Sequence, residues 1–516
     1  MFARLNSMGL SGINGFMVAV EADLSGGLPG FDVVGLPGAA VKESRDRVRA
    51  SLKNCGFTYP VSRITVNLAP ADVRKEGSVY DLPLLLALLA ASGQIPLPAE
   101  QTAFLGELSL TGEVRRVYGA LPMVMAARDA GIRQIFLPAE NAAEGAVVDG
   151  VEVYPVSSVI QLLEHLAERE PISPAVYTQA PESVVPAPDF ADVMGQAAAR
   201  RAMEIAAAGG HNVLLIGPPG SGKSMLAKRL PSILPDMTKE EALEATKIHS
   251  IAGTLPGGVG LLANRPFRSP HHNISAAGLA GGGTMPRPGE VSLAHNGVLF
   301  LDELPEFARP AMECLRQPLE DSQITISRVS ASLSYPCSIM LVAAMNPCPC
   351  GFFGHPTRAC TCSGVAAQNY LSRISGPLLD RVDLHIEVPP VEFQQLAAKT
   401  PAEPSSSIRK RVNAARAVQL RRFGQLDART DAKSVLVCNA HIPVNLIKKV
   451  CPLTPGAEEL LRGAFDRLGL SARAYDRLLK VARTIADLAG VDVIDTAHVA
   501  EAVQYRSLDR KYWQQR

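Results

Sequence analysis

The sequence predicts a multidomain α/β protein, and three observations support that class. The chain has 516 residues, of which 47% are hydrophobic and 20% charged, so it can bury two or three cores of ordinary domain size. Strand-like and helix-like segments alternate along most of its length. Pro, Ser and small residues interrupt the apolar pattern at 171–188 and 400–408, which we interpret as linkers between the parts 1–170, 189–399 and 409–516.

The first part contains segments of both kinds. Strands are predicted by the β-branched and aliphatic runs at 15–24, 63–70 and 133–140. Helices are predicted by the longer apolar patterns at 81–92 and 121–131. We therefore expect a mixed α/β domain here.

The second part repeats the alternation, and the third does not. Short aliphatic runs at 212–217, 297–303 and 338–346 are typical of buried strands in a parallel sheet. From residue 408 onward the pattern has the helical period, with basic residues on the polar faces. A helical C-terminal domain should therefore follow the second part.

Composition limits the class of protein without identifying a partner. The formal net charge of +1 provides no general attraction to nucleic acid, so any polyanion site must be a local group of Lys and Arg. Nine cysteines, an odd number, do not form a secreted disulfide framework. The start of the chain lacks the pattern of a signal peptide, and the longest apolar run, 82–92, is too short to cross a bilayer. We expect a cytoplasmic protein with no membrane partner.

A glycine-rich loop predicts phosphate binding. It fits GxxxxGK[ST], directly after a predicted strand and directly before a predicted helix. Its glycines let backbone amides surround phosphates, its lysine carries a point charge, and its serine can hold Mg²⁺. The alternative is a Gly-Pro turn without a ligand. The loop residues are Gly217, Pro218, Pro219, Gly220, Ser221, Gly222, Lys223 and Ser224.

Two further strand ends carry polar residues suited to nucleotide hydrolysis. Asp302 can hold the water shell of the metal, and Glu303 can activate the attacking water. Asn346 ends another strand of the same sheet and can help to position that water. The alternatives are an Asp-Glu pair with no role beyond ending a strand, and an Asn chosen for the turn into Pro347.

Four cysteines are concentrated directly behind Asn346. Their C-x-C, nine residues, C-x-C spacing offers four soft ligands to a tetrahedral Zn²⁺, although C-x-C is tighter than the usual spacing of zinc ribbons. His355 could replace one thiolate. Redox-active thiols and uncoordinated loop cysteines remain alternatives to structural zinc. The four are Cys348, Cys350, Cys360 and Cys362.

Several long blocks resemble the YifB/ComM family of magnesium-chelatase-like AAA+ ATPases. They include "DFADVMGQAAARRAMEIAAAGGHNVLLIGPPGSGKSMLA", "RPFRSPHHNIS", "GEVSLAHNGVLFLDELPEF", "AAMNPCPCGFFG", "RISGPLLDRVDL" and "SARAYDRLLKVARTIADLAG". The resemblance implies an AAA+ P-loop core at 189–399 and a magnesium chelatase-like helical lid at 409–516. It also implies ATP and Mg²⁺ as cofactors.

The resemblance assigns a role to each matching residue. Lys223 and Ser224 match Walker A, Asp302 and Glu303 match Walker B, and Asn346 matches sensor 1. Further matches are the arginine finger at Arg381, sensor 2 at Arg473, and apolar contacts to adenine at Val193 and Met194. An arginine on the terminal phosphate offsets charge in the transition state. Arg381 could instead make a surface ion pair, with Arg373 supplying the finger.

The resemblance also implies partners and a function. An arginine finger acts on a neighbouring copy, so we expect an ATP-promoted homo-oligomer, a hexameric ring. The ComM branch implies a motor on branched or single-stranded DNA, a branch-migration helicase linked to natural transformation. The alternatives are a magnesium chelatase subunit that drives metal into a porphyrin, and a regulatory scaffold that binds ATP.

The first part, 1–170, is similar to the proteolytic domain of the Lon family, which has the ribosomal S5 domain 2-like fold. The matching blocks are "LTGEVRRVYGALPMVMAARDAGIRQIFLPAEN" and "KEGSVYDLP". The similarity places Val79 at the position of the nucleophilic serine and Leu121 at that of the catalytic lysine. Neither side chain can perform the chemistry, and Ser78 is one position away, so we expect an inactive protease fold.

Two weaker candidates complete the set. His271 and His272 are adjacent, and we interpret them as loop residues without a ligand role. The alternating segment 324–336 predicts a hairpin strand that would carry Arg328 toward the pore of a ring and into contact with DNA.

Overall fold

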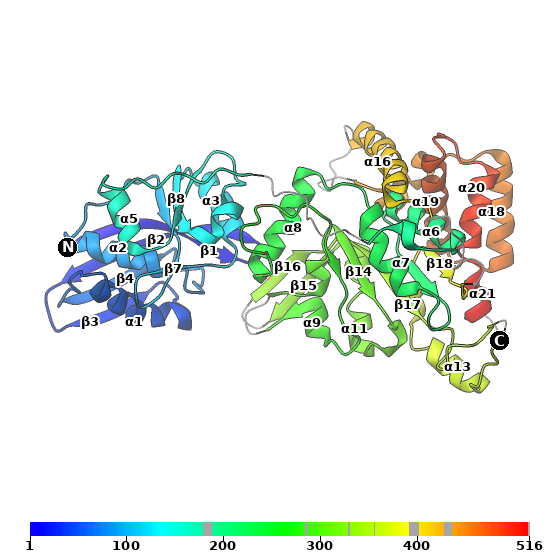
Figure 1. Ribbon diagram of the computed structural model, residues 1–516, viewed down its shortest axis with the longest axis horizontal. Helices are drawn as coiled ribbons and strands as arrows, with labels where there is room; N and C mark the ends of the chain where they lie inside the picture. The colour runs from blue at the N-terminus through cyan, green and yellow to red at the C-terminus, as the bar shows by residue number, and fades with distance from the viewer. Residues whose placement is uncertain are drawn as a thin grey trace. The chain divides into compact units, whose positions relative to one another are not determined.

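Contacts divide the chain into two units (Figure 1). The computed structural model describes residues 1–178, 188–283, 287–328, 331–355, 357–391, 402–427 and 436–513. Unit 1 comprises Met1–Glu182 and Ala242–Ala263, and unit 2 comprises Ser183–Glu241 and Asn264–Arg516. The sequence predicted three parts, and the structure differs from that division in two ways. Residues 242–263 pack with the first part, and the C-terminal helices share a core with the second.

Unit 1 is built on a seven-stranded mixed sheet. Its order is β3-β4-β2-β1-β5-β8-β9, with β2 antiparallel to both β1 and β4 and the other pairs parallel. The strands are β1 (Phe2–Ser11), β2 (Asn14–Ser25), β3 (Gly30–Val34), β4 (Arg63–Ala69), β5 (Thr102–Phe104), β8 (Gln134–Pro138) and β9 (Glu152–Val156), with a separate pair β6 (Glu107–Leu108) and β7 (Val114–Arg115). The helices are α1 (Ala39–Asn54), α2 (Asp81–Ala91), α3 (Ala120–Asp129), η1 (Ala139–Asn141), α4 (Ala142–Gly145) and α5 (Val159–Leu166).

The predicted segments of unit 1 are confirmed. Helix α2 is apolar on every side because it is buried along almost its whole length. Helix α8 (Lys239–Ala252) contributes its residues from Ala242 onward to this unit. There the Ser250 hydroxyl donates to Glu144 Oε2 at 2.6 Å, and Arg116 Nη2 donates to the carbonyl oxygen of Leu255 at 2.7 Å. The sequence of α8 has an ordinary helical pattern, so it does not indicate that this helix packs in unit 1.

Unit 2 contains the predicted parallel sheet. Its order is β11-β14-β17-β10-β18, and every neighbouring pair is parallel. These strands are β10 (Val213–Ile216), β11 (Phe267–Arg268), β14 (Gly297–Leu301), β17 (Ile339–Met345) and β18 (Leu384–Glu387). Two antiparallel pairs accompany them, β12 (Gly281–Gly282) with β13 (Arg287–Pro288) and β15 (Gln323–Arg328) with β16 (Ala331–Pro336). The second of these is the predicted hairpin.

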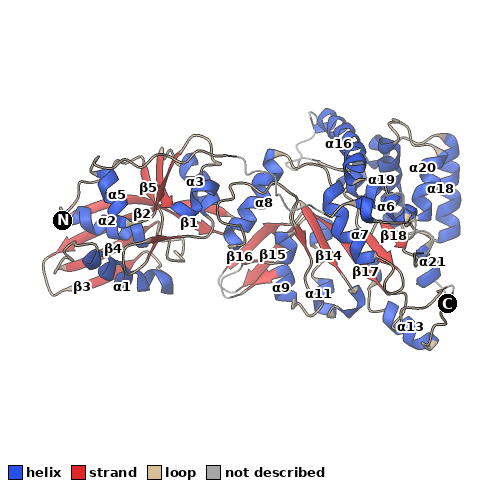
Figure 2. Ribbon diagram, in the orientation of Figure 1, coloured by secondary structure: helices blue, strands red, loops and turns tan. Residues whose placement is uncertain are grey.

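Helices surround this sheet and continue to the C-terminus. Those of the ATPase-like part are η2 (Phe190–Asp192), α6 (Ala197–Gly209), α7 (Lys223–Arg229), η3 (Leu230–Ile233), α9 (Ala276–Ala280), α10 (Glu290–Leu293), η4 (Leu304–Glu306), α11 (Arg309–Glu313), α12 (Pro318–Asp321), α13 (Gly364–Leu371) and α14 (Gly376–Leu379). The C-terminal ones are α16 (Ser405–Asp427), η5 (Asn439–His441), α17 (Val444–Val450), α18 (Pro455–Leu468), α19 (Ala472–Leu488), α20 (Thr496–Gln504) and α21 (Leu508–Tyr512). Figure 2 shows α16, α18, α19 and α20 gathered at one end of unit 2.

The predicted linker 400–408 is partly wrong, because α16 begins inside it. Ser405 is buried, and its hydroxyl accepts a hydrogen bond from the Phe190 amide at 2.8 Å, which explains why the helix starts there. Half of the other predicted linker, 179–187 of 171–188, lies outside the described residues. A single hydrophobic core joins Met203 of α6 to Ile485 of α19, so the lid helices and the sheet stabilise each other.

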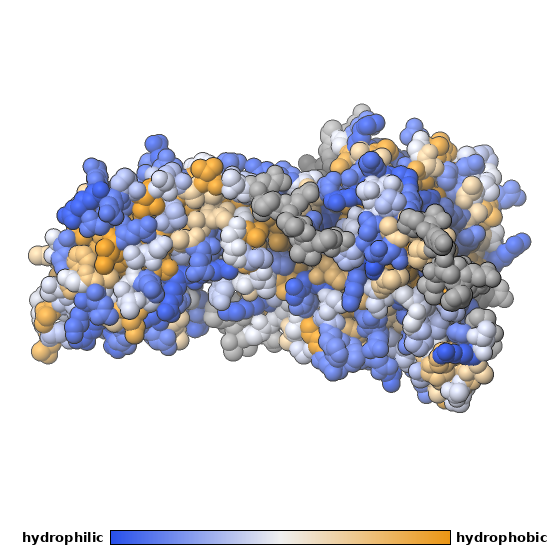
Figure 3. Space-filling model, in the orientation of Figure 1, coloured by the Kyte–Doolittle hydropathy of each residue, from blue (hydrophilic) through white to orange (hydrophobic). Residues whose placement is uncertain are grey.

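The polarity of the surface and the lengths of the apolar helices are those that the composition predicts. The face drawn in Figure 3 is largely hydrophilic, with apolar residues dispersed among the hydrophilic ones. Within the described part of the chain, no helix combines the length and apolarity that a bilayer crossing requires.

Candidate active site

The glycine-rich loop lies at the carboxyl end of β10 and leads into α7. Gly220 and Gly222 have φ of +77° and +91°, a left-handed conformation that favours glycine. Lys223 Nζ donates to the carbonyl oxygens of Gly217 at 2.7 Å and Pro218 at 2.8 Å. Burial lowers the pKa of Lys223 to about 8, against the opposing effect of the nearby carboxylates Asp302 and Glu303. The ammonium group is therefore held over the loop, with little solvent around it.

Three adjacent parallel strands bring the predicted hydrolytic residues together. The loop follows β10, Asn346 follows β17, and Asp302 follows β14, and these strands are neighbours in the sheet. Asn346 Oδ1 accepts from Lys223 Nζ at 3.2 Å, and the Ser224 hydroxyl donates to Asp302 Oδ2 at 2.6 Å. Since parallel strands end at the same edge, this contact set is what the sequence pattern implied. Ser224 and Asp302 offer the oxygen ligands that Mg²⁺ prefers.

Glu303 has a partner that the sequence interpretation missed. Its backbone has φ of +54°, its side chain is 56% exposed, and its Oε2 lies 3.3 Å from His272 Nδ1. His272 follows β11, the strand next to β14, so both residues lie at the same edge of the sheet. His272 lies in a turn, as expected, and its contact with Glu303 adds a neighbour that the sequence did not indicate. Recognising β11 in the sequence would have indicated that His272 lies near Glu303. This strand has only two residues, which is too short for its sequence pattern to be recognised.

The segment predicted to contact adenine is only partly accessible. Val193 is 0% exposed and belongs to the hydrophobic core, so its side chain has no free surface for a base. Met194 is half-buried. Gln196 of the same segment reaches the loop, where its Nε2 donates to the Ser221 carbonyl oxygen at 3.3 Å and to that of Pro389 at 2.6 Å. Gln196 therefore stabilises the loop, a role that sequence reasoning did not assign.

Arg381 lies at the other edge of the sheet. It precedes β18, and its carbonyl oxygen accepts from Asn212 Nδ2 at 2.9 Å, directly before β10 begins. The glycine-rich loop follows the end of β10, so one whole strand separates the two positions. Arg381 is 8% exposed, donates to the Pro377 carbonyl oxygen at 2.7 Å and forms an ion pair with Glu320. The structure does not bring Arg381 to the phosphate loop of its own chain.

Arg473 lies near the same carboxylate as Arg381. The pKa of Glu320 is lowered by its bond to Arg381 and further by the charges of Arg473 and Arg477. Arg477, one helical turn later on α19, donates to Asp383 Oδ1 at 2.8 Å. Arg381 therefore belongs to the amino-end edge of the sheet, and Arg473 lies close enough to the same carboxylate to affect its charge.

Arg373 has different contacts. Its Nη1 donates to the Pro305 carbonyl oxygen at 3.2 Å and to Glu306 Oε2 at 3.0 Å, and its side chain is 53% exposed. It lines an open pocket with Pro305 and Glu306 of η4 and with Phe307, which follows that helix. Arg373 is thus more accessible than Arg381, and both remain candidates for the finger.

The four clustered cysteines meet at one point. The Sγ atoms of Cys348, Cys350 and Cys360 are separated by 3.4, 3.7 and 3.5 Å, and all four sulfurs lie within 4.8 Å of one another. Zn–S bonds of 2.3 Å place the sulfurs of a tetrahedron ~3.8 Å apart, so the arrangement fits zinc. The amide of Cys350 also donates to Cys362 Sγ at 3.3 Å.

His355 does not join this cluster. Its Nδ1 accepts from the amides of Thr357 at 3.2 Å and Arg358 at 3.1 Å, and its ring lies against Phe352 with centroids 5.6 Å apart. The thiolates are consequently the four candidate ligands. The predicted DNA contact, Arg328, ends β15 by its backbone, and its side chain lies outside the described residues.

The positions of the protease residues in unit 1 are apolar and buried. Val79 is 8% exposed and Leu121 is 0% exposed, and both belong to the core of the unit. The Ser78 hydroxyl donates to Glu107, and Lys75 Nζ donates to the Val73 carbonyl oxygen at 2.7 Å. The described contacts therefore form no Ser-Lys pair at this position.

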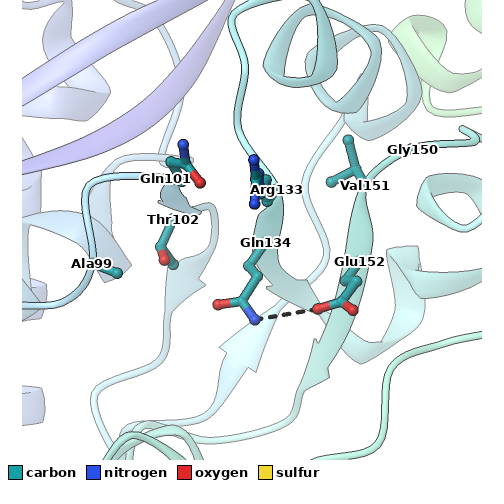
Figure 4. Close-up of a pocket in the computed structure, with 8 residues that line it drawn as sticks. All are labelled: Ala99, Gln101, Thr102, Arg133, Gln134, Gly150, Val151 and Glu152. Carbon is teal, nitrogen blue, oxygen red and sulfur yellow. Dashed lines mark hydrogen bonds between the residues drawn. The ribbon is translucent and has the colours of Figure 1, made fainter.

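Unit 1 also carries an open pocket at the edge of its sheet (Figure 4). Its lining comes from β5, β8, β9 and the turns before them, and Figure 4 shows Gln134 and Glu152 pointing toward one another across neighbouring strands. Gln134 Nε2 donates to Glu152 Oε2 at 3.2 Å. These polar groups already satisfy each other, and the pocket contains none of the predicted site residues.

Comparisons with known proteins match almost the whole chain. The family described as "Magnesium chelatase, subunit ChlI" matches residues 189–396. "Subunit ChlI of Mg-chelatase" matches 20–141, and "Magnesium chelatase, subunit ChlI C-terminal" matches 402–506.

Individual relatives extend the similarity over nearly the full length. An uncharacterized protein YifB of Escherichia coli is 44% identical over 508 residues, which cover 97% of this chain and 96% of the relative. The competence protein ComM of Haemophilus influenzae is 43% identical over 507 residues, with the same coverage of 97% and 96%. A Lon protease of Trichlorobacter lovleyi is 24% identical over 180 residues, 33% of this chain and 22% of the relative.

Proposed function

Because this chain belongs to the YifB/ComM family of magnesium-chelatase-like AAA+ ATPases, we propose that it is an ATP-hydrolysing ring motor that acts on branched DNA. The observation that carries the ATPase part is the convergence of Lys223, Ser224, Asp302 and Asn346 at one edge of the sheet. The DNA part is supported by similarity to a protein named for competence.

Each residue of the site has a chemical task in this proposal. The loop amides and Lys223 hold the phosphates of ATP, while Ser224 and Asp302 hold Mg²⁺, which neutralises phosphate charge when bound. Glu303, one residue beyond Asp302, accepts the proton of the attacking water, and Asn346 orients that water. Met194 is the accessible residue of the proposed adenine contact.

The proposed ring follows from the positions of the arginines. Arg381 lies at the amino ends of the strands, with Arg473 near the carboxylate that Arg381 pairs with, and the phosphate loop lies at the carboxyl ends. If either of these two arginines stabilises the transition state, it acts on the nucleotide of a neighbouring copy. A head-to-tail contact of this kind generates a ring where its rotation closes, and we propose that it closes as a hexamer.

Structural zinc completes the proposed set of cofactors. The spacing of the sulfurs fits a tetrahedral thiolate site, and the cysteines fold a segment with little regular structure between β17 and α13. The zinc would have a structural role, since four protein ligands leave no open coordination position.

A second candidate function is a magnesium chelatase subunit that drives metal into a porphyrin. The matched families are described in those terms, which is the specific observation in its favour. The two functions share the ATPase and differ in what stimulates it.

The proposal is tested by measuring ATP turnover with Mg²⁺, with and without four-way DNA, at several salt concentrations. We expect DNA to raise turnover less as salt increases. Glu303→Gln should retain nucleotide and lower turnover by about two to four orders of magnitude. Arg328→Ala should reduce the stimulation by DNA, and Ser332→Ala on the same hairpin is the matched control.

Two outcomes would contradict parts of the proposal. Wild-type turnover in Glu303→Gln would remove the assignment of the water-activating residue. No response to DNA at any salt, together with stimulation by a porphyrin and a partner protein, would favour the chelatase function instead.

A further inference from the structure

The cysteine segment contacts the phosphate loop directly. Gly351 follows Cys350 with φ of +82°, and its amide donates to the Cys348 carbonyl oxygen at 3.0 Å in a tight turn. A Cβ atom at Gly351 would lie 2.5 Å from Cδ of Pro219 and 2.9 Å from its Cγ. Glycine is therefore required for this approach, and the backbone of the cysteine turn lies against the third residue of the loop.

The same stretch of chain holds the loop at two further points. The Gly217 amide donates to the Met345 carbonyl oxygen at 3.2 Å, and Lys223 Nζ donates to Asn346 Oδ1 at 3.2 Å. Met345 and Asn346 directly precede Pro347 and the first cysteine. The residues directly before the cysteine segment therefore contact both ends of the loop motif.

The outer side of the cysteine segment is also supported. The Phe353 ring packs against Tyr512 with centroids 6.3 Å apart. The Tyr512 hydroxyl lies 3.3 Å from Glu387 Oε1, and Lys511 Nζ lies 2.6 Å from the same oxygen. Glu387 is on β18, next to β10, so the segment is placed between the loop on one side and α21 on the other.

We propose that the four-cysteine segment is a metal-dependent brace for the phosphate loop, so that zinc and nucleotide each strengthen the binding of the other. The inference rests on the zinc site proposed above and adds its regulatory consequence. Residues 346–363 contain no helix or strand among those described, so a metal held by the four cysteines would supply free energy that orders them. Coupling between two binding sites is reciprocal.

The test measures zinc release rather than enzyme activity. Protein purified without added metal is analysed for zinc and then mixed with a chromogenic zinc chelator, with and without saturating ADP. We expect about one zinc per chain. ADP should slow zinc release, and removal of zinc should weaken the binding of a fluorescent ADP roughly five- to 150-fold. The equilibrium affinity for zinc should rise by that same factor when ADP is bound. Lys223→Ala should abolish the effect of ADP on release.

Two glycine variants separate the brace from general damage. Gly351→Ala introduces the Cβ that collides with Pro219, so it should retain zinc and lose the protection by ADP. Gly354→Ala has a similar φ of +73°, but its Cβ would meet nothing nearer than Lys511 Nζ at 3.9 Å. This control should retain both zinc and protection. Pro219→Gly removes the contact from the loop side and replaces Gly351→Ala if that variant does not fold.

The outcomes distinguish the two proposals. Absence of zinc from the wild-type protein overturns both the zinc site and the brace, and leaves the ATPase proposal standing. One zinc per chain released at the same rate with and without ADP overturns the brace alone. Equal protection in Gly351→Ala and wild type would also overturn it, because the contact with Pro219 would then transmit nothing.

Discussion

At the scale of single residues, the pKa of Lys223 is determined by the burial of its side chain as well as by its chemical type. Burial lowers the pKa of Lys223 to about 8, although two carboxylates act in the other direction. An exposed lysine would remain charged far above that pH. The charge of Lys223, which we propose to bind phosphate, therefore becomes sensitive to pH within an accessible range.

This environment predicts the pH dependence of nucleotide binding. The ammonium form binds phosphate, so affinity should be constant below about pH 8. Above that pH, Lys223 of the free protein is mostly neutral and must take up a proton before it can bind the phosphate of ADP. The affinity for ADP should therefore fall by up to about tenfold per pH unit. The measurement is the Kd of a fluorescent ADP from about pH 6.5 to about 9.5. Lys223→Arg stays charged throughout and should show no change of slope, whatever its affinity.

His272 is expected to position Glu303. Loss of the contact between His272 Nδ1 and the Glu303 carboxylate lets the carboxylate rotate away from the water, so His272→Ala should lower kcat by roughly tenfold. KM should change little, because no contact with phosphate is lost. His272→Asn restores a donor near the position of Nδ1 and should recover part of the rate.

A control and a contrary outcome sharpen this prediction. His271→Ala removes the adjacent ring, whose Nδ1 accepts from the Asn273 amide at 3.3 Å, and should leave kcat near the wild-type value. A higher basal rate in His272→Ala would show that His272 restrains Glu303 instead of orienting it.

At the scale of elements, unit 1 has apolar residues at the two positions that align with the catalytic residues of a Lon protease. The positions of Val79 and Leu121 are filled by core residues, and Ser78 and Lys75 bond to other groups. A nucleophile needs a hydroxyl and a base within reach. The surrounding strands and helices preserve the shape of the domain because apolar packing requires no catalytic groups.

We therefore expect unit 1 to cleave no peptide bond. An unfolded test protein incubated with the full chain and ATP should remain intact on a gel, and Ser78→Ala should behave in the same way. Degradation by the wild type that disappears in Ser78→Ala would show that the alignment of the catalytic positions is wrong by one residue.

At the scale of the whole molecule, the proposed hydrolytic site takes its arginine from a neighbouring copy. The loop and its carboxylates lie at one edge of the sheet, and Arg381 lies at the other, with Arg473 near the carboxylate that Arg381 pairs with. Activity should consequently depend on the assembly of copies and rise more steeply than protein concentration.

Mixing two inactive variants tests this arrangement. Lys223→Ala lacks a working loop but retains Arg381, and Arg381→Ala has the opposite defect. In a randomly mixed ring about a quarter of the contacts pair an intact loop with an intact arginine, so part of the turnover should return. If the mixture is as inactive as either variant alone, Arg381 does not act across the contact. The same experiment with Arg373→Ala then decides whether that residue supplies the finger.

The sequence determined by itself those features that depend on neighbours along the chain. The phosphate loop at 217–224 is recognisable in the sequence because a strand, a glycine-rich loop and a helix follow one another. The strands at 297–301 and 339–345 are recognisable because parallel strands that are buried on both faces are aliphatic. Parallel pairing then places Asp302 and Asn346 at the edge of the loop, which made that part of the site predictable.

Only the tertiary structure decided the contacts between distant segments. The pairing of His272 with Glu303, the approach of Gly351 to Pro219 and the buried bond of Ser250 to Glu144 join residues that share no local pattern. The same holds for the start of α16 inside an expected linker, where Ser405 contacts Phe190. Local periodicity reports which face of an element is buried, whereas the identity of the group packed against that face depends on how the chain folds back on itself.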